Sequence, residues 1–115
     1  MTQLSVGLRN TLTDAWASET YEVALHDGDP GDDGSNEIEG ADRQEVSFND
    51  ASGGTAVADS DIVFEVPGDG TEVTHVSVRD EEGDFLSGGS TTSETFSNPG
   101  TYTLNELTLA INNPS

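Results

Sequence analysis

The feature that most constrains the fold is a short strand, THVSVR, at residues 74–79. Side chains alternate between the two faces of a strand, and valines lie on both faces of this one once Val73 is included. Such a pattern is typical of a strand that is covered on both sides. The flanking segments are shorter, more polar and interrupted by glycine, as at the edges of a sandwich. We therefore expect residues 74–79 to form the central strand of a β-sandwich.

The rest of the chain predicts a mainly β fold, an antiparallel β-sandwich of about eight strands with an N-terminal α-helix. Alternating apolar residues place strands at residues 20–26, 43–49, 55–58, 61–66, 73–79, 84–87, 94–96, 101–104 and 107–111. A turn at residues 80–83 should let the strands on either side of it pair antiparallel. Tyr21, Val23 and Leu25 are expected to point inward, and the Gly- and Ser-rich residues 88–92 are expected to form a link.

An apolar stripe predicts the helix at residues 3–18. Leu4, Leu8, Leu12, Ala15 and Trp16 recur at helical spacing and share one face. Trp16 fits either one end of the core or a groove on a neighbouring molecule. The core is favoured, because an aromatic residue in a helical stripe usually serves packing.

The length of 115 residues suits one domain with one hydrophobic core. We expect a helix within residues 1–19 and a sandwich over residues 20–112, which includes an acidic loop at residues 27–42. The chain contains no cysteine, which excludes disulfides, thiolate metal sites and a cysteine nucleophile. The N-terminus has no basic segment followed by an apolar one, so we expect the protein to be made in the cytoplasm without a secretion signal.

Charge is the strongest compositional signal, with 23 acidic residues, three arginines, no lysine and a net charge of −20. This charge repels phosphate backbones and anionic lipids, so nucleic acid and membranes are not expected partners. The acids are spread over alternating strands instead of forming one block. At molar salt the Debye length falls to about 3 Å and carboxylates stop repelling one another. We therefore expect a protein adapted to high salt, from a halophilic archaeal source.

The acidic loop is the candidate metal site, because carboxylates are the hard oxygen ligands that calcium prefers. Asp27, Asp29, Asp32 and Asp33 are the available ligands. An EF-hand starting at Asp27 would need Gly at position six and Glu at position twelve, and the sequence provides neither. We therefore expect no cofactor and a solvated loop, with an irregular calcium site as the alternative.

No enzyme signature is present, and we expect no catalytic residues. His26 and His75 would form an acid–base pair only if the sheet brought them together beside a nucleophile. The sequence has no serine in a G-x-S-x-G setting and no zinc-protease motif. Two strand histidines are then expected to have structural hydrogen bonds.

The few cations are candidate contact residues. Each arginine should pair with carboxylates, which Arg43 and Arg79 could do within the chain or across a subunit contact. Arg43, Arg79 and Trp16 are therefore the candidate interface residues.

Three sequence runs carry a resemblance to a known family. They are an L-H-x-x-D-P-G-x-x-G-x-N-E loop, an R-Q-x-V-x-F strand and a T-H-V-x-V-x-D strand followed by a leucine. The matching residues are Leu25, His26, Asp29, Pro30, Gly31, Gly34, Asn36, Glu37, Arg43, Gln44, Val46, Phe48, Thr74, His75, Val76, Val78, Asp80 and Leu86. In these runs the chain resembles small virion proteins of tailed viruses that are described as tail-fibre or minor tail proteins.

The resemblance implies a non-enzymatic structural protein of a virion, and the acidity suggests a haloarchaeal head-tailed virus. Its expected partners are other copies of itself, as a homo-oligomer, and other virion proteins. Tail, baseplate or fibre placement is the first expectation, and a capsid decoration or turret subunit is the alternative. An alternative of another class is an adhesion module that binds calcium or a host-surface glycan.

Overall fold

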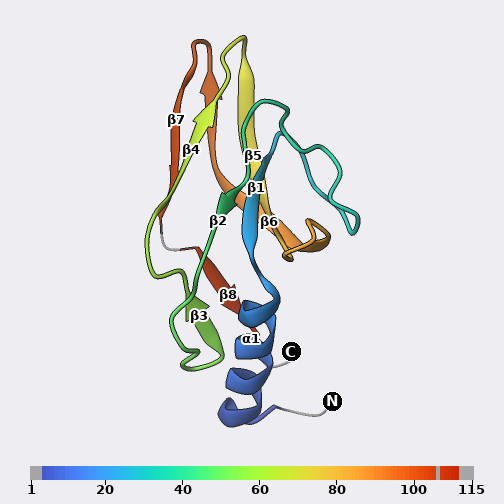
Figure 1. The fold of residues 1–115 in the computed structure, drawn as a ribbon, viewed down its shortest axis with the longest axis vertical. Coiled ribbons are helices and arrows are strands. Elements are labelled where there is room, and N and C mark those ends of the chain that lie inside the picture. The colour runs from blue at the N-terminus through green and yellow to red at the C-terminus, as the bar shows by residue number, and fades with distance from the viewer. Residues whose placement is uncertain (1–3, 106, 112–115) are drawn as a thin grey trace.

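The computed structural model describes residues 4–105 and 107–111. One helix is followed by eight strands along this part of the chain (Figure 1). The elements are α1 (Val6–Glu19), β1 (Glu22–His26), β2 (Gln44–Glu45), β3 (Thr55–Val57), β4 (Ile62–Val66), β5 (Thr71–Arg79), β6 (Phe85–Phe96), β7 (Gly100–Leu104) and β8 (Thr108–Ala110). The predicted mainly β fold with an N-terminal helix is confirmed.

The strands form three antiparallel sheets around one core. The largest sheet has the order β2-β1-β5-β6, whereas β3 pairs with β8 and β4 pairs with β7. Val23 and Leu25 of β1 meet Phe64 of β4 in the same hydrophobic cluster, and all three are fully buried. Figure 1 shows β4 and β7 beside β5 at one end of the molecule, and β3 and β8 beside α1 at the other.

β5 is a central strand, as predicted, because it lies between β1 and β6. On one face Val76 and Val78 contact the hydrophobic core. On the other face Ser77 is fully buried and Arg79 is only 6% exposed. The chain segment that covers this second face is the acidic loop of residues 27–42, which lies beside the sheet in Figure 1.

β6 differs from the prediction of two short strands joined by a link at residues 88–92. It is one strand of 12 residues that pairs with β5 along its length, with irregular register between Val73 and His75 and again between Val78 and Arg79. The glycines do not break the strand, because β5 supplies backbone partners to Gly88 and Gly89. The predicted pairing across the 80–83 turn is confirmed.

The strand predicted at residues 43–49 shrinks to β2, at residues 44–45. After β2 the chain leaves the large sheet, and Phe48 forms an isolated bridge with Ala58 near β3. The inward position predicted for Tyr21 is also wrong. Tyr21 precedes β1 and is 40% exposed, whereas all of Val23–His26 is buried because both faces of β1 are covered.

The helix forms close to its predicted range, with Ser5 as the N-cap accepting a hydrogen bond from the Leu8 N–H. Part of its apolar stripe faces solvent, however, with Leu8 45% and Leu12 40% exposed. Thr13, on the opposite face, is fully buried. Trp16 is half-buried and packs against the core, so the position favoured for it is confirmed.

Candidate functional site

The acidic loop is held on the sheet by Arg79. Its guanidinium donates to the Gly34 carbonyl at 3.3 Å and to the Gly83 carbonyl at 3.1 Å, and it lies 3.5 Å from a carboxylate oxygen of Glu37. The centroid of the Phe85 ring lies 5.8 Å from the guanidinium carbon, within the range of a cation–π contact. A buried cation thus joins the loop to the β5–β6 hairpin.

His26 and Ser77 extend this contact into one hydrogen-bonded chain. His26 Nδ1 lies 2.7 Å from the Ser35 carbonyl, which only accepts, so Nδ1 carries the proton. In the neutral ring Nε2 then accepts from the Ser77 hydroxyl at 2.7 Å, and Ser77 Oγ accepts from Arg79 Nε at 3.3 Å. We call His26, Ser77 and Arg79 the clamp, because together they bind the loop backbone at residues 34 and 35.

Burial lowers the pKa of His26, and the positive charge of Arg79 acts in the same direction. The Ser35 carbonyl and the carboxylates of Glu37 and Asp27 oppose this shift. The neutral imidazole that the hydrogen-bond chain requires is therefore the form that the folded protein favours.

Arg43 forms the outer part of the same ion cluster. It binds Glu37 through two parallel hydrogen bonds of 2.9 and 2.8 Å, and its Nη1 donates to Glu22 at 3.1 Å. These bonds hold the pKa of Glu37 below its ordinary value, so Glu37 stays ionised next to the two arginines. The structure therefore uses Arg43 and Arg79 within the chain. A subunit contact through either one stays a prediction.

Two glycines allow the loop to approach the sheet. Gly34 has a φ of +82°, and a Cβ there would lie 2.5 Å from Arg79 Nη2. A Cβ on Gly88 of β6 would lie 2.5 Å from the ring of Pro30, which is itself buried. Pro30, Ile38 and Ala41 are buried in a segment expected to be solvated, so that expectation is wrong for the apolar part of the loop.

The structure does bring the two histidines to facing positions, since His26 of β1 pairs with His75 of β5. His75 Nδ1 lies 2.8 Å from the Thr74 hydroxyl, whereas His26 contacts Ser77. The His26–Ser77 pair has the spacing of a base and a nucleophile. Both side chains are fully buried, however, so a substrate has no route to Ser77 in this conformation. The structural hydrogen bonds expected for the two histidines are present.

The four predicted metal ligands are not brought together. Asp27, Asp29, Asp32 and Asp33 all lie on the outside of the loop, and Asp29 and Asp33 accept hydrogen bonds from within it. The hydrogen bonds from Ser35 lower the pKa of Asp33.

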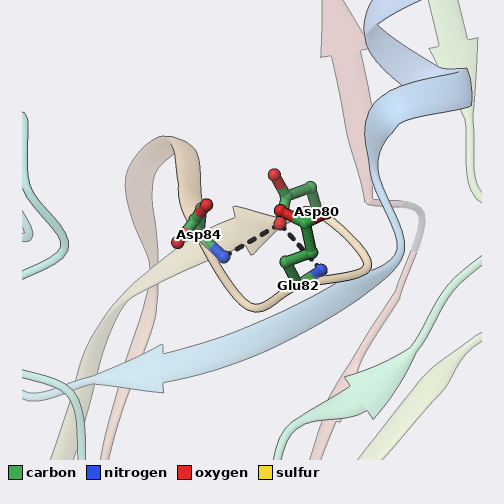
Figure 2. A group of neighbouring side chains, drawn as sticks. All are labelled: Asp80, Glu82 and Asp84. Atoms are coloured by element: carbon green, nitrogen blue, oxygen red, sulfur yellow. Dashed lines mark hydrogen bonds between the residues drawn. The ribbon is translucent and has the colours of Figure 1, made fainter.

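A different carboxylate group lies in the β5–β6 turn. Asp80, Glu82 and Asp84 place one oxygen each within 4.8 Å of one another, the one such group among the residues described. Figure 2 shows one carboxylate oxygen of Asp80 accepting from the backbone N–H groups of Glu82 and Asp84, at 3.0 and 2.9 Å. These bonds shape the turn.

Trp16 lies at the edge of a small apolar groove of about 160 Å³. Val76, Val78, Leu107 and Leu109 form the groove together with residues 87–90 of β6. This position agrees with packing at one end of the core, and an intermolecular role for Trp16 stays a prediction.

Several residues of the site have no distinctive signal in the sequence. Ser77, Glu22 and the 80–84 acids form no motif of a binding or catalytic site, and Glu37 stands out only as part of the N-E pair of the loop run. Strand alternation does place Ser77 and Arg79 on one face of a buried strand, where each needs a polar partner. That signal identifies the need for partners but does not name them.

Within the described residues no helix has the length and hydropathy needed to cross a membrane.

The comparisons with known proteins place the chain in a family. No curated protein and no solved structure shows significant similarity. Residues 5–112, which include α1, the acidic loop and all eight strands, match the family of the podophage GP4 fiber I protein gp80. The chain therefore belongs to this family of phage fibre structural proteins.

Proposed function

We infer that the chain is a fibre subunit on the tail or baseplate of a head-tailed virus. In this role it works by self-association and by docking on other virion proteins, without catalysis. Family membership over residues 5–112 carries this proposal. The buried state of His26 and Ser77, the best-placed pair for nucleophilic chemistry among the described residues, supports a structural role.

The shape of the subunit supports a repeated element in a larger assembly. Its principal extents are 47, 27 and 25 Å, with α1 at one end of the long axis (Figure 1). A single small contact per copy is weak, but several copies that dock on one scaffold bind with a high effective concentration. Closed rotational symmetry is the usual arrangement for such copies.

The charge supports a virus of a halophilic archaeon as the source. In the acidic loop the carboxylates are spread over the surface, while Pro30 and Ile38 are buried beneath them. A hydrated carboxylate surface over an ordinary apolar core suits molar salt, where screening removes the repulsion. Circular dichroism during dialysis from molar potassium chloride into dilute buffer tests the proposed adaptation to high salt. An unchanged β signal in dilute buffer contradicts that adaptation.

Mass spectrometry of purified particles tests the fibre proposal directly. We expect the protein in intact virions, enriched with tails after heads and tails are separated, at a copy number that is a small multiple of the tail symmetry. Enrichment with heads at a copy number close to that of the major capsid protein would favour the capsid decoration or turret alternative. Absence from the particles overturns both.

One observation favours calcium and glycan binding as a second candidate function. The exposed Tyr21 shares a cleft of about 460 Å³ with Asp80 and Glu82, and aromatic rings beside carboxylates suit sugars and cations. A melting temperature that rises on calcium addition and falls again with chelator would support it, with Asp80→Asn as the variant that loses the response. The fibre proposal expects no change on chelation.

A further inference from the structure

The inward face of α1 contacts the body of the protein through hydrogen bonds as well as through the packing of Trp16 and Ala17 on the core. Thr13 Oγ1 donates to the Gly54 carbonyl at 2.8 Å, and Asn10 Oδ1 accepts from the Gly54 N–H at 2.7 Å. Asp14 Oδ1 accepts from the Ala51 N–H at 2.8 Å. The helix is thus fixed in orientation by polar groups, which an amphipathic surface helix normally presents to water.

The outward face of α1 carries an apolar stripe that ends at the exposed Glu19. Three of the five large hydrophobic side chains that are exposed in the described part of the chain, Val6, Leu8 and Leu12, lie on this helix. Leu8 and Leu12 are one turn apart and continue through the exposed Ala15 along the same face. We call Leu8, Leu12 and Ala15 the outer stripe. Their exposure in water is unfavourable, so a covering surface stabilises the helix.

Arg9 beside this stripe has no carboxylate partner among the described residues, in contrast to Arg43 and Arg79. Its Nη1 donates a long hydrogen bond of 3.4 Å to the Gly53 carbonyl. Its Nε is buried without a hydrogen-bond partner in the same part of the chain. Because Arg9 is half-buried, its Nε–H is closed to a partner, and the rest of the guanidinium is the part left for a carboxylate from another molecule.

The low charge of α1 favours a second copy as the occupant. Arg9 against Asp14 and Glu19 leaves the helix at −1, within a chain of −20. In dilute buffer two copies therefore repel over most of their surface, and least at segments of low charge such as α1. The helix lies at one end of the long axis, so copies joined there keep the acidic loops apart (Figure 1). The stripe itself carries no charge for a basic partner to recognise.

We propose that copies of the chain associate through the outer stripe of α1, with Arg9 pairing with an acidic side chain of the neighbouring copy. This rests on the proposed function and names the surface through which the fibre subunits join. The stripe of one copy packs on the same stripe of another, as a symmetric interface requires. Arg9 fixes the rotation of the helices, because the guanidinium must reach a carboxylate.

Sedimentation equilibrium in molar potassium chloride tests the proposal with four proteins. We expect the wild type to associate reversibly and the double variant Leu8→Gln/Leu12→Gln to dissociate at least tenfold more readily. Val63→Gln is the matched control, because Val63 is 49% exposed on β4, away from the helix. Arg9→Gln should weaken association less than the double variant. If the glutamine double variant loses its helical circular dichroism signal, Leu8→Ala/Leu12→Ala replaces it. Alanine favours the helix and shortens both leucine side chains of the outer stripe.

A monomeric wild type overturns the proposal, as does a double variant that associates like the wild type. Association that is lost in Val63→Gln and kept in the double variant places the interface on β4 and also overturns it. Mass spectrometry of virions tests the function separately. A chain present in virions but monomeric refutes the interface alone, whereas a chain absent from virions refutes the fibre role whatever its oligomeric state.

Discussion

The acidic loop and α1 both lie outside the β-sandwich, and they are attached to it in opposite ways. The loop is strongly acidic, with seven carboxylates in residues 27–42, yet it buries Pro30 and Ile38. Its backbone carbonyl at Gly34 accepts a hydrogen bond from the buried Arg79. The helix is nearly neutral, yet it buries Thr13 and exposes Leu8. The loop therefore completes its contacts within one chain, whereas the helix leaves an apolar stripe exposed.

From this contrast we expect the acidic loop to affect mainly the stability of the fold and α1 to affect mainly association between copies. Buried polar groups are costly when unpaired, so the clamp should couple the loop to folding. Exposed apolar groups cost little in the monomer, so α1 should matter mainly when copies meet.

The largest expected effect comes from removing Arg79. Arg79→Met leaves the carbonyls of Gly34 and Gly83 without their cation and Glu37 with Arg43 alone, which should lower the free energy of unfolding by about 3 kcal/mol. Arg9→Met is the matched control on the helix and should change the free energy of unfolding by less than about 0.5 kcal/mol. Urea denaturation of the monomer measures both. Equal losses in the two variants would contradict the contrast.

A neighbouring pair of glycines tests the loop more gently. Gly88→Ala places a methyl group against Pro30 and should cost about 1–3 kcal/mol by overpacking. Gly89→Ala has open space around it and should be nearly neutral. Thermal denaturation with limited proteolysis of the loop distinguishes them. A loop that stays protected in Gly88→Ala would show that Pro30 does not hold it.

The clamp should also make stability depend on pH. Burial lowers the folded pKa of His26, so below about 6.5, its ordinary value, the unfolded chain binds a proton that the folded chain resists. Stability is therefore lost as the pH falls through that value. Glu37 acts in a lower window: its depressed pKa adds stability above about 4.5, which is lost as the pH falls further.

Variants separate this contribution from that of the other acids. His26→Gln should be less stable overall and should lose the slope between about pH 7.5 and 5.5, measured by urea denaturation. His75→Gln should retain the slope. A slope unchanged in His26→Gln would remove the clamp histidine from the explanation.

The smallest effect is expected in the outer stripe. Under dilute conditions that keep the protein monomeric, Leu8→Gln should shift the free energy of unfolding by no more than about 0.5 kcal/mol, as should Val63→Gln. A large loss in Leu8→Gln alone would mean that the stripe already packs within one chain.

Sequence patterns that extend over a few residues predict the strands and turns that depend only on neighbouring positions. Ile62, Phe64 and Val66 alternate with exposed residues in β4, because one face of that strand meets the core. The turn at residues 67–70 is equally clear, with Asp69 and Gly70 at positive φ. Alternation and turn residues act within a few positions, so the sequence shows them directly.

The clamp is beyond such patterns, because its parts come from distant positions. His26 meets Ser77 only after β1 pairs with β5, and only then does residue 35 have a surface to bind. The leucine stripe poses a different difficulty. Spacing reveals an apolar face on the helix, but spacing is the same whether that face meets its own sheet or another molecule.

The strand order also determines when the subunit is able to fold. Glu22 pairs with Arg79, Thr55 with Ala110 and Ile62 with Leu104, so all three sheets wait for segments made much later. Folding through such non-local pairing is slow, on the order of milliseconds to seconds. Long loops must close, with a loss of entropy, before the paired strands make stabilising contacts. The three sheets are therefore complete only after β8 has been made. In dilute buffer the high negative charge keeps unfinished chains apart until β8 is made, whereas molar salt removes that repulsion.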